Sequence, residues 1–185
     1  IMRGSDNYSF QEIKDKLDAL KANVSMSAGE HGSSLAIRFQ TDHDHLVELI
    51  AFIGETLSNP TFPEDEFTVL KQQQLTSMQG MLSDPQQLLF RRLRQRLNPF
   101  DEDSIHHVPD LSVLIKRMEA LTLEDVQSFY KKQYGAGHAR FSIVGDMDES
   151  KVLKALQDAF SHWNPDSTFE RIGKQLLPSI KVDEW

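Results

Sequence analysis

The chain has 185 residues, enough for one ordinary domain with a hydrophobic core. Its net charge of −8 argues against nucleic acid or an anionic membrane as the main partner, because both attract concentrated positive charge. The absence of cysteine excludes disulfides and thiol chemistry, and no apolar run approaches the roughly 20 residues that span a bilayer. We therefore expect no nucleic-acid partner and no membrane partner.

The first predicted elements are a helix and a hairpin. Ser9 and Glu12 form an S-x-x-E capping box, and apolar residues follow at helical spacing, which predicts an amphipathic helix over 10–20. Residues 22–28 and 33–40 alternate between polar and apolar side chains on either side of a glycine-containing turn. This pattern predicts a half-buried β-hairpin.

Three helices are predicted in the middle of the chain. The first has apolar residues at helical spacing over 46–57, and Ser58-Asn59-Pro60 ends it, because proline disfavours helical geometry in the residue before it. The second runs from about 64 to 81 and starts with three carboxylates, which suit the positive end of the helix dipole. The third follows the N-cap Asp84, with Pro85 in its first turn.

The C-terminal half is predicted to contain shorter elements. They are a polar loop over 101–109, helices over 111–118 and 122–134, a strand over 140–144, a helix over 148–160 and a second short strand over 176–182. These elements place the hairpin and the helices in separate blocks along the chain. This order indicates an α+β fold, an antiparallel sheet packed against a layer of helices, rather than βαβ units.

The densest cluster of metal-capable side chains lies at the start of a predicted helix. It consists of Asp42, His43, Asp44, His45 and Glu48. The sequence H-L-V-E-L at 45–49 has leucine where the zinc-binding motif H-x-x-E-H has its second histidine. A zinc site needs three well-placed protein ligands. The favoured interpretation is a helix N-terminus with acidic caps and solvated histidines. A metal site at His43, His45 and Glu48 is the alternative.

Two further groups of residues are candidates for binding. His106 and His107 are adjacent in a polar loop, where neighbouring side chains point apart, so we interpret them as surface histidines. The arginines at 91, 92, 94 and 96 surround most of a helix. They form either a solvated face or a surface that grips acidic residues of a neighbouring domain, since arginine favours interfaces. No G-x-S-x-G, phosphate loop or EF-hand pattern occurs, so residue chemistry alone indicates no active site.

Three segments, in this order, resemble a known family. They are L-S-N-P-T-F-P-E-D-E-F at 57–67, A-L-T-L-E-D-V-Q-S-F-Y-K-K-Q-Y at 120–134 and F-S-I-V-G-D-M-D at 141–148. Segments 20–29 and 84–100 fit as well. Together they resemble the pitrilysin/insulinase family of zinc metallopeptidases, which includes the subunits of the mitochondrial processing peptidase.

The resemblance implies a protein of two or four homologous α+β repeats, whose halves close like a clamshell over an unfolded peptide. One repeat supplies zinc through the motif H-x-x-E-H and a distal Glu on a later helix, and the Glu of the motif acts as general base on zinc-bound water. The other repeats are degenerate and complete the chamber. Zinc is therefore expected in a catalytic repeat of the parent protein.

The chain departs from the catalytic pattern of this family in two ways. H-x-x-E-H occurs nowhere in the sequence. The distal Glu of the family would fall in the helix after Phe62-Pro63, around Gln74 to Ser77, yet no carboxylate occurs from Phe67 to Ser83. A zinc site without its third ligand is not expected to be catalytic. We therefore expect a non-catalytic repeat of a zinc metalloendopeptidase, with no catalytic residue, no metal ligand and no assigned substrate-binding residue in this chain.

The expected organisation is one repeat over 1–165, without its N-terminal strands and first helix, and a tail or linker over 166–185. The chain would be a fragment of a longer, bacterial protein, with a periplasmic or other extracytoplasmic location favoured. Its expected partners are the other repeats of the same polypeptide and an extended peptide, which could pair with the hairpin 22–40. A structural or assembly protein built from the same repeat, without peptidase activity, is the alternative. Exposed apolar surface would make the excised chain self-associate.

Overall fold

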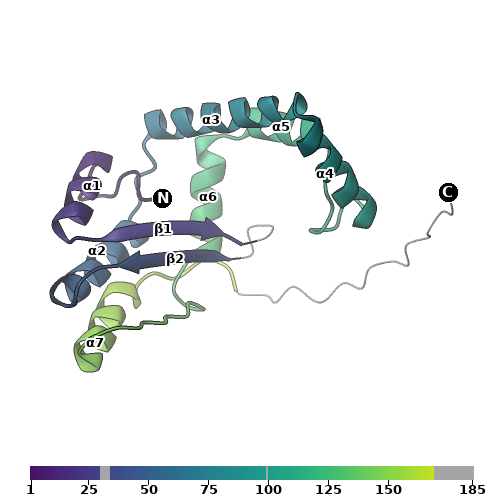
Figure 1. Cartoon of the computed structure of the whole chain (residues 1–185). Coiled ribbons are helices and arrows are strands. Elements are labelled where there is room, and N and C mark those ends of the chain that lie inside the picture. Colours follow the sequence, from purple (N-terminus) through teal and green to yellow (C-terminus); the bar gives the residue numbers. More distant parts are fainter. Residues whose placement is uncertain (30–33, 99, 169–185) are drawn as a thin grey trace. The chain divides into compact units, whose positions relative to one another are not determined.

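The computed structural model describes residues 1–29, 34–98 and 100–168, which contain seven α-helices and a two-stranded antiparallel sheet (Figure 1). The elements are α1 (Phe10–Ala19), β1 (Asn23–Ala28), β2 (Leu35–Gln40), a 3₁₀ helix (His43–His45), α2 (Leu46–Ser58), α3 (Glu64–Leu82), α4 (Pro85–Leu97), α5 (Leu111–Ala120), α6 (Leu123–Gln133) and α7 (Glu149–Phe160). The predicted α+β class is confirmed. None of the helices in the described ranges is long and apolar enough to cross a bilayer.

The described residues form two compact units. Unit 1 combines those within Ile1–Phe67 and Leu123–Phe169, and unit 2 contains those within Thr68–Thr122. The first turn of α3 belongs to unit 1, and the rest of that helix belongs to unit 2.

The sheet of unit 1 is the predicted hairpin. β1 and β2 pair antiparallel, from Asn23 opposite Gln40 to Ala28 opposite Leu35. Side chains alternate between exposed and partly buried along β2. The partly buried side chains of both strands, such as Met26 and Ile37, pack against the hydrophobic core. The residues of the predicted turn from 30 to 32 lie outside the described part of the chain.

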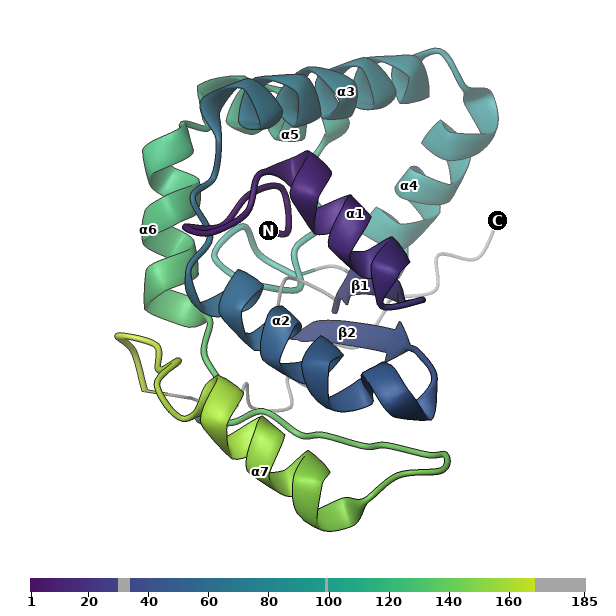
Figure 2. The ribbon, with the colours of Figure 1, turned by 90° about the vertical axis from the view of Figure 1, so that its left-hand side faces the viewer.

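Helix α2 supplies most of the core. Figure 2 shows α2 in front of the hairpin and next to α7. Its most buried side chains are Leu49, Ile50, Phe52, Ile53 and Leu57. Residues 49–54 are all apolar, which explains this burial, because a helix buried against both a sheet and another helix needs apolar residues around most of its circumference.

The α2–α7 pair is packed closely at Gly54. A Cβ atom at this position would lie 2.6 Å from the Cβ of Ala159 and 2.9 Å from its carbonyl oxygen. These distances leave no room for a methyl group, so glycine sets how near the two helices approach. Val152, Ala155 and Phe160 of α7 are buried in the same core.

The turn after α2 is tied to α6. Phe62 has a left-handed backbone, with φ of 49°, which is uncommon for a residue other than glycine. Its ring packs edge-on against Tyr130, with centroids 5.3 Å apart. The Tyr130 hydroxyl donates a hydrogen bond of 2.5 Å to the carbonyl of Leu57, and burial raises the pKa of this tyrosine. Two contacts from one buried side chain therefore fix the end of α2 and the reversal that follows it.

The junction between β2 and α2 is organised by Asp42. Its carboxylate caps the 3₁₀ helix by accepting from the backbone N–H of His45 and also accepts from the His45 ring. The ammonium of Lys21, just before β1, donates to it over 2.9 Å. The hydrogen bonds from Lys21 and His45 lower the pKa of Asp42 to about 2. One carboxylate thus joins Lys21, in the segment that leads into β1, to the segment between β2 and α2.

Unit 2 has a small core and much exposed apolar surface. Leu111 and Ile115 of α5 are buried. The ammonium of Lys71 donates to the carbonyls of Glu119 and Leu121, both over 2.8 Å, and so links α3 to the end of α5. The exposed large apolar residues of α4 are Leu88, Leu89, Phe90, Leu93 and Leu97.

The predicted strand over 140–144 is wrong. Within the described ranges, no backbone hydrogen bond joins these residues to β2, and the sheet has only β1 and β2. Val144 is 97% exposed and Phe141 is 46% exposed. An alternating apolar pattern makes a strand only where a neighbouring backbone pairs with it. The predicted strand over 176–182 lies outside the described residues.

We expect Gly54→Ala to destabilise the protein by about 1–3 kcal/mol, because the added methyl group would clash with Ala159. Gly80→Ala in α3 is the matched control, since a Cβ there would meet no atom within 4 Å. That control should gain about 0.5–1 kcal/mol from alanine's higher helix propensity. Urea unfolding followed by circular dichroism measures both, and equal effects of the two substitutions would contradict the close packing of α2 and α7.

We expect Asp42→Asn to destabilise the protein at neutral pH and to lose this effect in acid. The pKa of Asp42 is about 2 in the folded chain against 3.8 ordinarily, so its stabilisation is present above about pH 4 and is lost as pH falls through about 2. Urea unfolding of wild type and variant between pH 7 and pH 2 measures the difference. Asp44→Asn removes the same charge nearby but leaves the hydrogen bonds to Asp42 in place, so it should destabilise the protein less than Asp42→Asn at pH 7.

Candidate functional site

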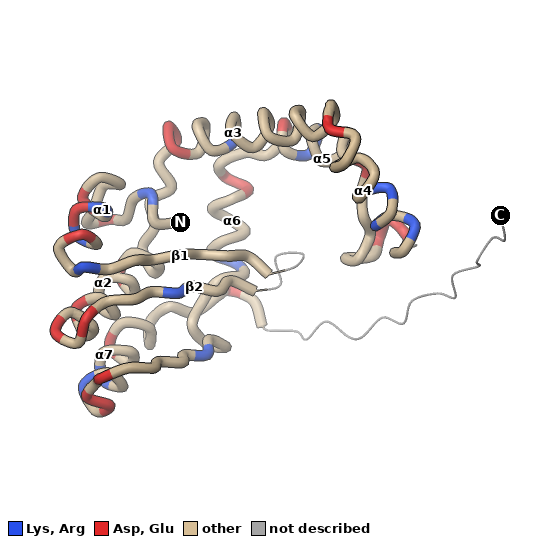
Figure 3. Tube along the Cα trace, in the orientation of Figure 1, with Lys and Arg blue, Asp and Glu red and all other residues tan. Residues whose placement is uncertain are grey.

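The helix expected to carry the distal zinc ligand is α3, and it has no carboxylate beyond its first turn. Glu64, Asp65 and Glu66 form that acidic turn, which Figure 3 shows at the start of the helix. Gln74 and the residues after it in α3 offer amides, hydroxyls and two thioethers, and Gln74 itself is exposed. Carboxylate, imidazole and thiolate are the usual zinc ligands, so this part of α3 is unsuited to zinc.

The Asp42–Glu48 cluster does not converge on a common point. Asp42 binds Lys21 and His45, as described above. Glu48 pairs with the ammonium of Lys16 over 2.5 Å, and this hydrogen bond lowers the pKa of Glu48 and raises that of Lys16. In the part of the chain that the structure describes, no group of three His, Asp or Glu side chains is arranged to hold a metal. The alternative of a metal site at His43, His45 and Glu48 is therefore not supported.

His43 has a partner from a distant part of the chain. Its ring Nδ1–H donates to the carbonyl oxygen of Asp146 over 3.1 Å, and the Asp146 carboxylate lies 3.7 Å away. This contact joins the end of β2 to the segment that precedes α7. His43 is thus a structural link between two segments of unit 1.

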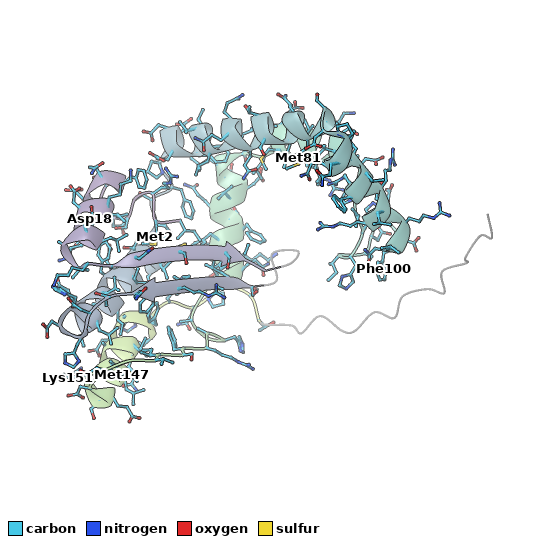
Figure 4. The ribbon with its side chains drawn as sticks, in the orientation of Figure 1. Met2, Asp18, Met81, Phe100, Met147 and Lys151 are labelled. Atoms are coloured by element: carbon cyan, nitrogen blue, oxygen red, sulfur yellow. The ribbon has the colours of Figure 1, made fainter. Side chains whose placement is uncertain are left out.

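The adjacent histidines of the polar loop are half-buried rather than fully exposed. His107 Nδ1–H donates to the carbonyl of Phe100 over 2.9 Å, and the ring of His106 packs on that of Phe100 with centroids 5.2 Å apart. Phe100 is labelled in Figure 4, on the loop after α4. Both histidines therefore fold back onto their own loop and stabilise it.

Arg91 and Arg92 of the arginine run in α4 make contacts within unit 2. Arg91 donates to the carbonyl of Pro109, and burial lowers the pKa of its guanidinium. Arg92 lies 3.6 Å from the carboxylate of Asp110. Arg94 is exposed on the same helix. The run thus fastens α4 to the start of α5, and a role at an interface stays a prediction.

Unit 1 has a cavity of about 840 Å³ that the sequence analysis did not identify. It is lined by residues of α2, α6 and α7, among them Glu55, Phe62, Tyr130, Tyr134, Asp158 and Trp163. Tyr130 stacks on Tyr134 and on Trp163, with centroids 5.2 and 6.2 Å apart. The helical spacing of the two tyrosines was the one signal in the sequence, and it is equally typical of a core. The Glu55 carboxylate is already bound by Ser5 and Asn7, and no catalytic group of known geometry is formed here by the described residues.

A second, smaller cavity of about 340 Å³ lies along the free edge of β2. It is lined by Ile37 to His43 and Leu46 on one side and by Ser142 to Met147 on the other. Figure 4 labels Met147, where this segment leads into α7. The backbone edges that face this cavity are the second feature that the sequence did not reveal.

Comparison with known proteins identifies the fold. Residues 120–183 match the family model described as "Peptidase M16 inactive domain". No curated protein matches the sequence.

Two solved structures share the fold. A protease from Helicobacter pylori is 16% identical, with a TM-score of 0.71, and the match covers 97% of this chain and 41% of that one. A peptidase M16 inactive domain from Pseudomonas fluorescens is 20% identical, with a TM-score of 0.71, and covers 90% and 40%. The chain therefore spans about two fifths of the length of each.

The match to the inactive domain, the shared fold and the missing distal carboxylate agree with one another. M16 is the peptidase family of pitrilysin and insulinase, so the resemblance stated from the sequence is confirmed. The chain has the fold of the M16 peptidase inactive domain, and its residues 120–183 match the model of that domain.

Proposed function

We propose that this chain is the non-catalytic part of a zinc metalloendopeptidase and forms part of the chamber wall that encloses a peptide substrate. The observation that carries the proposal is the composition of α3. By the family resemblance, this helix corresponds to the one that carries the distal Glu in a catalytic repeat, and from Phe67 to Leu82 it contains no Asp or Glu. Zinc and hydrolysis would then belong to another repeat of a parent protein, which we take to be bacterial.

The structure is suited to a supporting role. Unit 1 has a closely packed core between α2, α7 and the hairpin, which makes a firm platform for a sheet that faces a chamber. Unit 2 carries exposed apolar side chains and the arginine run on α4. Apolar patches edged by arginine are typical of surfaces that bind other proteins. We take the other repeats of the same polypeptide as the partners of this surface.

A structural or assembly protein built from the same repeat is the second candidate function. The lack of a carboxylate in α3 beyond its first turn fits this role equally well, because a repeat of this composition can also occur in a protein that has no catalytic repeat. The two candidate functions expect the same properties of this chain and differ only in whether another repeat of the parent protein carries the zinc motif.

The sequence of the full-length gene product tests the proposal. We expect an H-x-x-E-H motif with a distal Glu in another repeat, and zinc-dependent cleavage of a quenched fluorescent peptide by the purified parent. Replacing the Glu of that motif by Gln should abolish cleavage, because it removes the general base. This chain alone, with added zinc, should cleave nothing above the buffer control. A parent without the motif would exclude the peptidase role and favour the assembly role.

We also expect the isolated chain to self-associate through the exposed apolar residues of α4. Leu89 is 66% exposed and Leu93 is 48% exposed. Leu89→Glu should weaken association about tenfold or more, because it places a charge on the apolar surface that would be buried. Gln87→Glu adds the same charge at an exposed position of α4 and should leave association within about twofold. Sedimentation velocity over a concentration series measures this, and a wild-type chain that stays monomeric at high concentration would contradict it.

A further inference from the structure

Helix α4 faces its own unit with polar side chains. Arg91 and Gln95 are four residues apart, and so lie on one side of the helix, and both are half-buried. The Arg91 guanidinium donates to the carbonyl oxygen of Pro109. The Gln95 amide donates to the carbonyl oxygen of Val108 over 3.2 Å and to the Asp110 carboxylate over 2.9 Å. The polar side of α4 is therefore the side that is fastened to the segment before α5.

The apolar side of the same helix is exposed. Leu89, Leu93 and Leu97 follow one another at intervals of four residues, so they form one row along the helix. Phe90 lies next to this row. The exposed fractions of the three leucines are 66, 48 and 49%, and that of Phe90 is 52%. A surface helix ordinarily turns its apolar side inward, so α4 has the reverse arrangement. We call these four residues the α4 stripe.

Arginine borders the α4 stripe on both sides. Arg92 and Arg96 lie along one side, each three residues after a leucine of the row, and Arg94 lies on the other side, four residues after Phe90. All three side chains are exposed, and α4 contains no Asp or Glu. Figure 3 shows the basic residues of α4 in blue. The stripe thus has an apolar centre and a positively charged rim.

The charge of the rim decides between the possible partners. A second α4 helix would bring arginine against arginine, and like charges across an interface are unfavourable. An anionic membrane would repel a chain whose net charge is −8. A helix with an apolar row between Asp and Glu residues matches both parts of the surface, because arginine binds carboxylates through strong, often bidentate hydrogen bonds. A row of side chains four residues apart also fits the groove of another helix.

We propose that the α4 stripe binds an acidic amphipathic helix from another repeat of the parent polypeptide. The partner places apolar side chains on the leucine row and carboxylates against the arginines of the rim. This inference rests on the proposed function for the source of the helix. It deepens that function by naming the element of this chain that makes the contact and the chemistry of what it binds. Self-association of the isolated chain is then a weaker use of the same stripe, without the matching charges.

The probe is a labelled synthetic helix of about 20 residues, a length that is helical in water, with a leucine row edged by glutamates. We expect saturable binding to the 185-residue chain, measured by fluorescence anisotropy at concentrations where the chain is monomeric. Hydroxyl-radical footprinting should show protection of the α4 stripe. The same helix with lysine in place of glutamate, and a scrambled peptide with the glutamates kept, should each bind about tenfold more weakly or less.

Three results with these probes would overturn the proposal. They are no binding of the glutamate-edged helix, equal binding of the lysine-edged helix, and protection outside α4. Vesicles of phosphatidylcholine and phosphatidylserine test the lipid alternative. Binding of the chain to these vesicles without binding to the glutamate-edged helix would assign the stripe to a membrane instead.

A charge reversal in the rim provides a second test. Arg94→Glu should weaken binding of the glutamate-edged helix about tenfold and should strengthen binding of the lysine-edged helix. Lys116→Glu makes the same change at an exposed position of α5 and should leave both affinities within about twofold. An Arg94→Glu chain that fails to fold would bind neither helix, whereas the proposal requires this exchange of preference. Unchanged preference in the folded variant would contradict it.

Cross-linking in the purified parent protein identifies the source of the helix. A photoreactive residue in place of Leu89 should cross-link to an acidic helix of another repeat in the same polypeptide. Cross-links to a second copy or to a separate protein would overturn this assignment. The result does not depend on the zinc motif. This cross-link in a parent without H-x-x-E-H would exclude only the peptidase role, and its absence in an active peptidase would exclude only the proposed partner of α4.

Discussion

The burial of α2 is the constraint on which unit 1 depends. This helix packs on the hairpin and on α7 at once, and Gly54 allows its backbone to come within contact of Ala159. Protein interiors are packed to crystal-like density, so an added methyl group at such a crossing must displace a whole helix. The cavities of about 840 and 340 Å³ are both lined in part by residues of α2.

Local signals in the sequence predicted most helices well, because their determinants are local. Ser9, Asp84 and Asp148 each accept hydrogen bonds from the backbone at the start of a helix, as their residue types and positions suggest. Residues 140–144 were mispredicted because a strand is defined by its neighbour, and alternation alone does not supply one. The close approach at Gly54 was equally hidden, since it depends on a residue more than one hundred positions away.

The candidate site shows the same division between local and distant determinants. The lack of a carboxylate in α3 beyond its first turn could be predicted from the sequence. No residue from Phe67 to Leu82 is Asp or Glu, so the exact alignment with a catalytic repeat does not matter. The Asp42–Glu48 cluster has the composition of a metal site, yet its side chains have separate partners. Glu48 pairs with Lys16, Asp42 pairs with Lys21, and His43 lies beside Asp146. All three partners come from other elements, so the composition of the cluster could not show this. The cavities of about 840 and 340 Å³ are lined by segments that meet only in the folded chain.

The discontinuity of unit 1 has a consequence for the order of folding. Its two parts are separated by the whole of unit 2, and Tyr130 from the second part fixes the turn at Phe62 in the first. The left-handed backbone of Phe62 is unfavourable until that contact exists. On the ribosome, unit 1 therefore cannot complete its core until α7 has been synthesised. Because the entropy of loop closure rises only slowly with loop length, unit 2 could vary in length at little cost to the stability of unit 1.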